Sequence, residues 1–185
     1  MNINPDYEKL NRKQIQFIRD GIASEEDFNI TLQGETLSGK SWIANEIYKA
    51  MDHPMRRKLT ANEIASKYEY YKFSDFSDRN EFLSDLYRLR FCPVLILDDI
   101  GDEFGSAQKT QYIKSFLSDR LDFISRTNTL SCPFPKRIIT VFTTRLKQAE
   151  IRARYGVKVE KGLPSKTTIL QIKGLPITYN VIKNK

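Results

Sequence analysis

The chain has 185 residues, of which 40% are hydrophobic, and its net charge is +7. This length and composition suit one domain with a sizeable core, over residues 1–185. No apolar run approaches the roughly 20 residues that cross a bilayer, and the N-terminal segment lacks the basic start and apolar centre of a signal peptide. We therefore expect a cytoplasmic protein with no membrane partner.

Hydrophobic periodicity predicts the elements of the first half of the chain. Residues 28–33 alternate apolar and polar side chains, which predicts a short strand. Residues 42–51 place Ile43, Ile47 and Met51 on one helical face. Further expected elements are a helix at about 5–20 (with Tyr7, Leu10, Phe17 and Ile18 inward), a strand at 57–61, a helix from about 61, and an amphipathic helix at 80–90 with Phe82, Leu83, Leu86 and Leu89 along one side.

The second half of the chain contains the more apolar strands. The continuous apolar run over 94–97 is typical of a strand that is buried on both faces of a parallel sheet. Residues 137–144 predict another buried strand, and residues 107–126 predict a helix between the two. Residues 167–180 predict one or two short strands around a turn. Since strands alternate with helices, the predicted fold class is α/β, with a mostly parallel sheet flanked by helices.

A glycine-rich motif lies between the first strand and the following helix. Residues 34–41 read G-x-x-x-x-G-K-S, the phosphate-binding loop of P-loop NTPases, in the strand–loop–helix context that this motif requires. Its backbone N–H groups can face phosphate oxygens, Lys40 adds a positive charge, and the Ser41 hydroxyl can hold Mg²⁺. The sequence therefore predicts binding of ATP with Mg²⁺. The predicted nucleotide-binding residues are Gly34, Glu35, Thr36, Leu37, Ser38, Gly39, Lys40, Ser41 and Trp42.

Two carboxylates end the apolar strand at 94–97. Asp98 is placed as the Mg²⁺ ligand, because this strand and the phosphate-binding loop are expected to lie close together. Asp99 beside it is placed to orient or deprotonate the attacking water. The predicted metal ligands are thus Ser41 and Asp98, and Lys40 and Asp99 are predicted catalytic residues.

Five segments together resemble AAA+ ATPases, and most of all the helicase loaders of the DnaC/DnaI kind and the related IstB transposition ATPases. These segments are the loop at 34–41, Leu83–Leu86 ahead of Val94–Gly101, Ser118–Arg120, and Val141–Thr144. The resemblance covers roughly residues 28–175 and implies an oligomeric ATPase with a nucleotide-binding core at 28–144. It leaves an N-terminal helix and loop at 1–27, and a basic segment at 145–185 with a reduced or absent C-terminal lid.

The same resemblance implies roles for several residues after the core strands. Thr144 or Arg145 would act as the sensor at the end of the strand 137–144, although the family usually has Asn where Arg145 stands. An arginine finger, which reaches the γ-phosphate of a neighbouring subunit, is expected near Arg152 or Arg154. The alternative for both arginines is a position facing solvent or DNA.

The charge distribution indicates the class of partner. Residues 145–185 have ten basic and two acidic side chains, a net charge of +8, whereas residues 1–144 have a net charge of −1. Such asymmetry favours a polyanion, with a solvated basic tail that binds no ligand as the alternative. The partner that we expect is DNA, in single-stranded form. Aromatic residues between lysines at 67–73 could stack on bases or pack in the core.

The predicted function is therefore an ATPase acting on DNA in replication or mobile-element transfer, as a homo-oligomer with a replicative helicase or transposase as partner. A small-molecule kinase and a nucleotide-dependent adaptor with little turnover are the alternatives.

Overall fold

The computed structural model describes residues 12–73, 75–103, 106–126, 137–166, 168–172 and 179–182. Strands and helices alternate along most of this length. In chain order the elements are α1 (Arg12–Ala23), β1 (Phe28–Gly34), α2 (Lys40–Ala50), β2 (Arg57–Thr60), α3 (Ala61–Phe73), α4 (Phe76–Phe91), β3 (Val94–Ile100), α5 (Ala107–Arg126), β4 (Ile139–Thr144), α6 (Gln148–Tyr155), α7 (Val157–Lys166), β5 (Thr168–Ile172) and β6 (Tyr179–Ile182).

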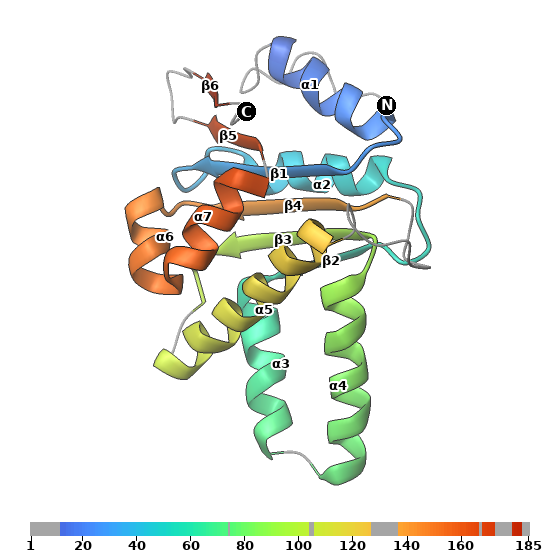
Figure 1. Cartoon of the computed structure of the whole chain (residues 1–185), viewed down its shortest axis with the longest axis vertical. Helices are drawn as coiled ribbons and strands as arrows, with labels where there is room; N and C mark the ends of the chain where they lie inside the picture. The colour runs from blue at the N-terminus through green and yellow to red at the C-terminus, as the bar shows by residue number, and fades with distance from the viewer. Residues whose placement is uncertain are drawn as a thin grey trace.

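A six-stranded sheet forms the centre of the molecule, in the order β2-β3-β4-β1-β5-β6 (Figure 1). The first five strands are parallel, and β6 pairs antiparallel with β5. β4 lies between β1 and β3, with Gln33 opposite Thr144 and Leu97 opposite Phe142. The five parallel strands end at the same edge of the sheet. The predicted α/β fold class is confirmed.

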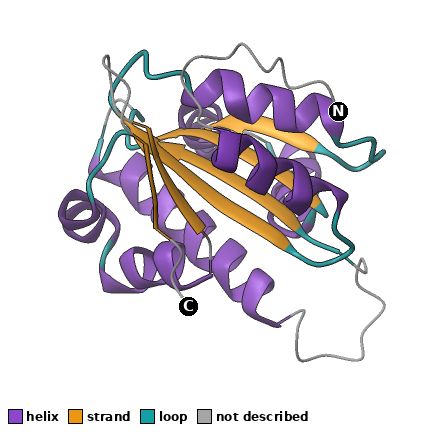
Figure 2. Cartoon of the chain, turned by 90° about the horizontal axis from the view of Figure 1, so that it is seen from above, coloured by secondary structure: helices purple, strands orange, loops and turns teal. Residues whose placement is uncertain are grey.

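Helices cover both faces of the sheet (Figure 2). One apolar cluster packs α1 and α2 against one face of the sheet. A second cluster packs the five helices from α3 through α7 against the opposite face. β3 contributes to both, because successive side chains of a strand point to opposite faces. Val94 and Ile96 belong to the first cluster, and Leu95 and Leu97 to the second. The apolar run is therefore buried on both faces, as the sequence predicts.

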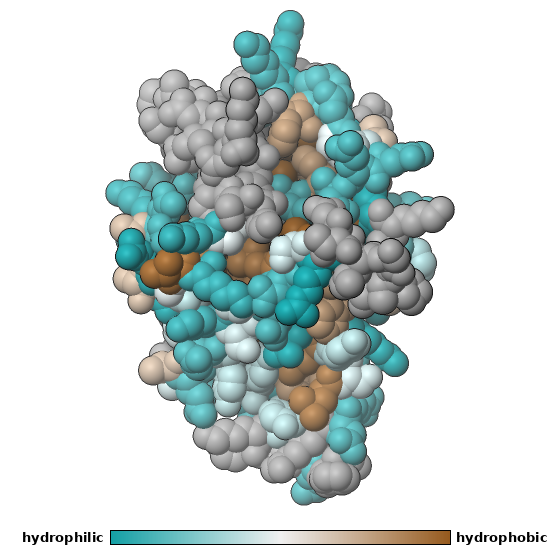
Figure 3. Space-filling model, viewed as in Figure 1, coloured by the Kyte–Doolittle hydropathy of each residue, from teal (hydrophilic) through white to brown (hydrophobic). Residues whose placement is uncertain are grey.

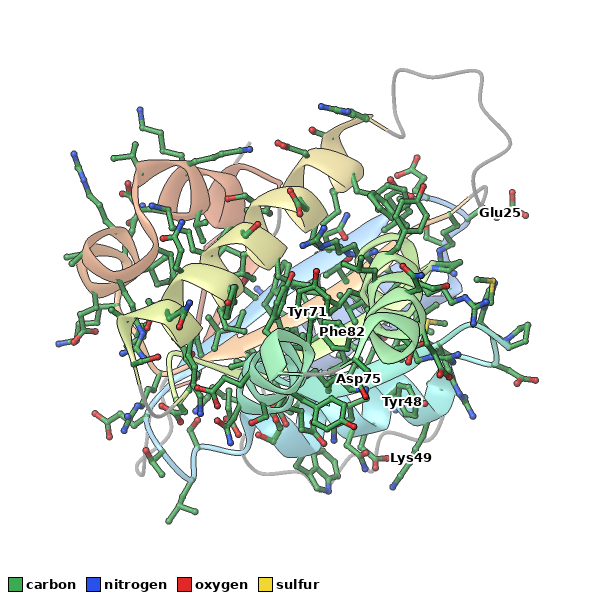
Figure 4. The ribbon with its side chains drawn as sticks, turned by 90° about the horizontal axis from the view of Figure 1, so that it is seen from below. Glu25, Tyr48, Lys49, Tyr71, Asp75 and Phe82 are labelled. Atoms are coloured by element: carbon green, nitrogen blue, oxygen red, sulfur yellow. The ribbon has the colours of Figure 1, made fainter. Side chains whose placement is uncertain are left out.

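The helices α3 and α4 form a hairpin that extends beyond the sheet (Figure 1). Tyr71 stacks on Phe82 between the two helices, with ring centroids 5.1 Å apart (Figure 4). Tyr68 is 8% exposed and stacks on Tyr112 of α5 at 4.4 Å. A strip of apolar surface runs between the two helices on the face seen in Figure 3. Packing thus accounts for Tyr68 and Tyr71, whereas Tyr70 is 68% exposed.

Two details differ from the sequence-based expectations. Leu83 is 47% exposed although it was expected to point inward. Phe82, Leu86 and Leu89 contact the core, and Leu83 lies about 100° further around the helix than Phe82. Residues 148–166 form two helices that the sequence did not predict, and β5 pairs with β1, so the sheet extends beyond the core expected at 28–144.

The expected helix residues 5–11, with Tyr7 and Leu10, and the turn at 174–176 lie outside the described residues. Among the helices that the structure describes, none combines the length and the apolar character needed to cross a membrane.

Candidate functional site

The glycine-rich loop connects the end of β1 at Gly34 to the start of α2 at Lys40. Gly39 has φ 94° and Leu37 has φ 63°, so the loop curls through the left-handed region, which glycine adopts readily. The buried Lys40 ammonium donates a hydrogen bond to the Glu35 carbonyl oxygen at 2.7 Å. The loop therefore wraps around a positive charge at the N-terminus of a helix, the end that attracts anions.

Ser41, Asp98 and Thr143 meet at the edge where the parallel strands end. The Ser41 Oγ donates to Asp98 Oδ1 at 2.9 Å, and the Thr143 Oγ1 donates to the same carboxylate oxygen. The Thr143 Oγ1 also accepts a hydrogen bond from the Asp99 N–H at 2.8 Å. Because β4 lies between β1 and β3, Thr143 stands between the loop and the two aspartates, and it fixes both.

Asp99 has an unusual backbone and an altered acidity. Its φ of 56° lies in the left-handed region, at an irregularity in the pairing of β3 with β4 between Leu97 and Ile100. Burial, and then the charges of Asp98 and Asp102, raise the pKa of Asp99 above its ordinary value. A carboxylate with a raised pKa is a stronger base, which suits proton abstraction.

Lys40 and Asp99 influence each other across the site. Burial lowers the pKa of Lys40, and the neighbouring carboxylates, with Asp99 first, oppose this effect. Lys40 in turn counteracts the rise in the pKa of Asp99. The site thus places three carboxylates, those of Asp98, Asp99 and Asp102, within electrostatic reach of the buried Lys40 ammonium.

A cavity of about 510 Å³ opens between the glycine-rich loop and the aspartates. Arg145 and Asp102 form one wall as an ion pair, with Nε and Oδ1 2.6 Å apart. The residues that line the cavity are Thr36, Leu37, Gly39, Lys40, Ser41, Trp42, Asp99, Asp102 and Arg145. The structure therefore brings most of the predicted nucleotide-binding residues together with Asp99 and Arg145.

Thr144 and Arg154 lie outside this lining. The buried Thr144 hydroxyl donates to the Ile100 carbonyl at 2.7 Å and accepts from the Leu146 N–H at 3.1 Å. Both of these hydrogen bonds are therefore to backbone atoms. Arg154 donates from Nε to the buried carboxylate of Glu103 at 2.8 Å. Arg152, on the same helix, is exposed.

The donor set and its dimensions fit a nucleoside triphosphate with Mg²⁺. The cavity volume lies within the roughly 300–1,000 Å³ that is typical of small-molecule sites. The Ser41 hydroxyl and Asp98 carboxylate are oxygen ligands of the kind that Mg²⁺ prefers, and their 2.9 Å separation allows them to share one ion. Trp42, 36% exposed at the cavity wall, adds an apolar surface beside the loop.

Three residues of this region were not identified from the sequence: Thr143, Asp102 and Glu103. Thr143 precedes the expected sensor position by one residue, and the alternation of a strand could have indicated which hydroxyl faces the aspartates. Asp102 and Glu103 follow the aspartate pair after a turn, whose geometry the sequence does not reveal.

Comparisons with solved structures find proteins of similar fold. The DnaC helicase loader is similar with a TM-score of 0.66 and 19% identity, over 91% of this chain and 95% of that one. DnaI is similar with a TM-score of 0.59 and 19% identity, over 90% and 84%. AMPPCP-bound DnaA from Aquifex aeolicus is similar with a TM-score of 0.59 and 13% identity, over 88% and 46%.

No family model and no curated protein sequence matches the chain. At these identities the structural likeness shows the fold alone.

Proposed function

We propose that this protein binds ATP with Mg²⁺ at the cavity and hydrolyses it. The observation that carries the proposal is the contact between Ser41 and Asp98 at 2.9 Å, beside the buried ammonium of Lys40. An oxygen pair and a cation at the N-terminus of a helix are what a triphosphate with a divalent cation requires.

Each side chain has a distinct role in this proposal. The N–H groups of the loop and Lys40 hold the phosphate oxygens, and Ser41 and Asp98 hold the Mg²⁺, which would neutralise phosphate charge. Asp99 orients the attacking water and accepts its proton, for which its raised pKa is suited. Arg145 lies at the cavity wall, paired with Asp102, where it can respond to charge at the γ-phosphate.

The role in the cell that we propose is work on DNA in replication, in the manner of a helicase loader, or in mobile-element transfer. The structural likeness to the DnaC helicase loader and to DnaA supports this proposal at the level of the fold. Homo-oligomers are part of it, because Arg152 is exposed on α6 and could reach the nucleotide of a neighbouring copy. A replicative helicase or a transposase would be the protein partner.

DNA would contact the basic helices α6 and α7. Arg152 and Lys161 are exposed on them, and Lys158 is exposed although paired with Asp122. Contact through phosphates predicts affinity that falls steeply with salt.

The experiment measures ATP binding and Mg²⁺-dependent hydrolysis, with and without single-stranded DNA. Lys40→Ala is expected to abolish both ATP binding and hydrolysis. Lys49→Ala, at the far end of the same helix, is the matched control, since Lys49 is 64% exposed and pairs with Glu46 of its own helix (Figure 4). It should leave both activities unchanged.

Wild-type protein that binds no ATP would refute the proposal. Phosphoryl transfer to a small acceptor, with no effect of DNA, would replace it with a kinase. A change of oligomer size on ATP binding with negligible turnover would refute the proposed hydrolysis and would indicate a nucleotide-dependent adaptor.

A further inference from the structure

We infer that Glu103 is a positioning residue, which fixes the turn after Asp98 and Asp99, at the end of β3, relative to the helix α6. This inference rests on the proposed ATP hydrolysis and assigns to it a residue outside the nucleotide cavity. Glu103 contacts neither the cavity nor the aspartates and would act only through the backbone that holds Asp99.

The carboxylate of Glu103 is fully buried and accepts hydrogen bonds from two directions. From its own loop, the Gly101 N–H donates to Oε2 at 3.0 Å. From α6, Arg154 Nε and Tyr155 Oη both donate to Oε1, at 2.8 Å and 2.5 Å. The guanidinium also donates from Nη2 to the Glu103 carbonyl oxygen at 3.0 Å. One side chain thus joins the turn after β3 to the end of α6.

The loop itself is a closed turn that this carboxylate completes. The Asp102 N–H donates to the Asp99 carbonyl at 3.1 Å, which closes the turn directly after the predicted base. Gly101 has φ 101°, and a Cβ there would lie 2.5 Å from the Leu146 side chain, so the turn is packed tightly. This turn sets the orientation of Asp99, and Glu103 stabilises the turn by accepting the hydrogen bond of the Gly101 N–H.

The electrostatics of the cluster also indicate a positional role. Burial alone would lower the pKa of Arg154, but the hydrogen bond and charge of Glu103 outweigh it and raise that pKa. Burial, and then Glu103, raise the pKa of Tyr155. An apolar contact could join loop and helix without the cost of burying a charge, and charged clusters of this kind add geometric definition. A shift of α6, which also carries the exposed Arg152, would therefore be transmitted to Asp99.

The test is Glu103→Gln, which preserves shape and removes the charge. We expect kcat for ATP to fall about ten- to hundredfold, because misplacing a catalytic group by a fraction of an ångström is costly. The Kd of a fluorescent ADP should change by less than about twofold, since the phosphate-binding loop is untouched. Val159→Ala is the matched control: Val159 is fully buried in the same apolar cluster as Tyr155, and no hydrogen bond is lost with its methyl groups. It should lower the unfolding midpoint while leaving kcat close to wild type.

A second variant keeps the inference testable if Glu103→Gln fails to fold. Tyr155→Phe removes one hydrogen bond to the carboxylate, and Tyr155 lies outside the cavity lining. A smaller fall in kcat, about threefold, with unchanged Kd is expected, because a single bond is lost. If kcat in either variant falls no more than in Val159→Ala, the positioning role is refuted. If the wild type does not hydrolyse ATP, the proposed function itself fails, a result visible before any variant is made.

Discussion

Replacing Thr143 by valine tests how the aspartate pair is held. Thr143 is fully buried and makes two hydrogen bonds, one to the Asp98 carboxylate and one from the Asp99 N–H at 2.8 Å. Valine has nearly the same volume, so the substitution removes both bonds with little change in packing. The perturbation thus concerns the two aspartates and leaves the sheet in place.

The magnitude follows from the two lost bonds. The Asp99 N–H would be buried without a partner, at about 1–3 kcal/mol, and a hydrogen bond to a charged carboxylate contributes about 1.5–3 kcal/mol. Part of this is recovered because valine is apolar, so we expect a loss of about 2–4 kcal/mol of unfolding free energy. For a chain of this size, that lowers Tm by roughly 4–16 °C.

The assay compares Thr143→Val with Thr144→Val in urea unfolding and in ATP hydrolysis. Thr144 is equally buried and also makes two hydrogen bonds, but to the backbone of Ile100 and Leu146. Both variants should lose stability. Only Thr143→Val should lower kcat, by about tenfold or more, because it alone releases Asp98 and Asp99. Thr143→Ser should restore kcat through its hydroxyl. Equal loss of kcat in the two valine variants, at equal loss of stability, would refute the reasoning.

Three further outcomes are expected. The native-state pKa of Asp99 lies above its unfolded value, so its ionised form destabilises the fold. Asp99→Asn should therefore raise Tm at pH 7, and this gain should vanish as pH falls to about 3.9. An unchanged Tm at neutral pH would contradict the argument that burial raises this pKa. Arg120 is fully buried and donates to three backbone carbonyls and Thr140. Arg120→Met should therefore lower the free energy of unfolding in urea by about 3 kcal/mol. An unchanged urea midpoint would show that these carbonyls find other partners. Gly101→Ala should lower the free energy of unfolding by about 1–3 kcal/mol, because of the positive φ at this position and the close approach of Leu146. The double variant with Leu146→Ala, measured by the same unfolding, should recover only the part of this loss that comes from the clash with Leu146.

Much of the fold could be predicted from the sequence, because its strongest signals are local. The apolar run at 94–97 can be satisfied only by burial on both faces, and the motif at 34–41 specifies its own strand, turn and helix. The helices α6 and α7 escaped prediction because each is short and Gly156 separates them, whereas Ile151, Tyr155 and Val159 are buried among other elements. Tertiary contacts supply what the local pattern does not show.

The candidate site was predictable where residues act through a motif, and not where they act through register. Lys40, Ser41 and Asp98 follow from spacing within a motif. The choice between Thr143 and Thr144 depends on which face of β4 meets β3, and a shift of one residue reverses it. The bond from Glu103 to α6 connects segments about fifty residues apart, and no local pattern encodes such a contact.

The position of β4 between β1 and β3 also determines when the site can exist during synthesis of the chain. Phe28 pairs with Ile139, and Val94 pairs with the same residue from the other side, so the sheet centre closes through contacts between distant residues. A nascent chain that ends before residue 139 contains the whole glycine-rich loop and both aspartates, but it lacks β4, the strand that lies between β1 and β3. Contacts of such sequence separation form late in folding. Nucleotide binding would therefore report completion of the domain, and ATP in the cell would favour the finished fold over every shorter intermediate.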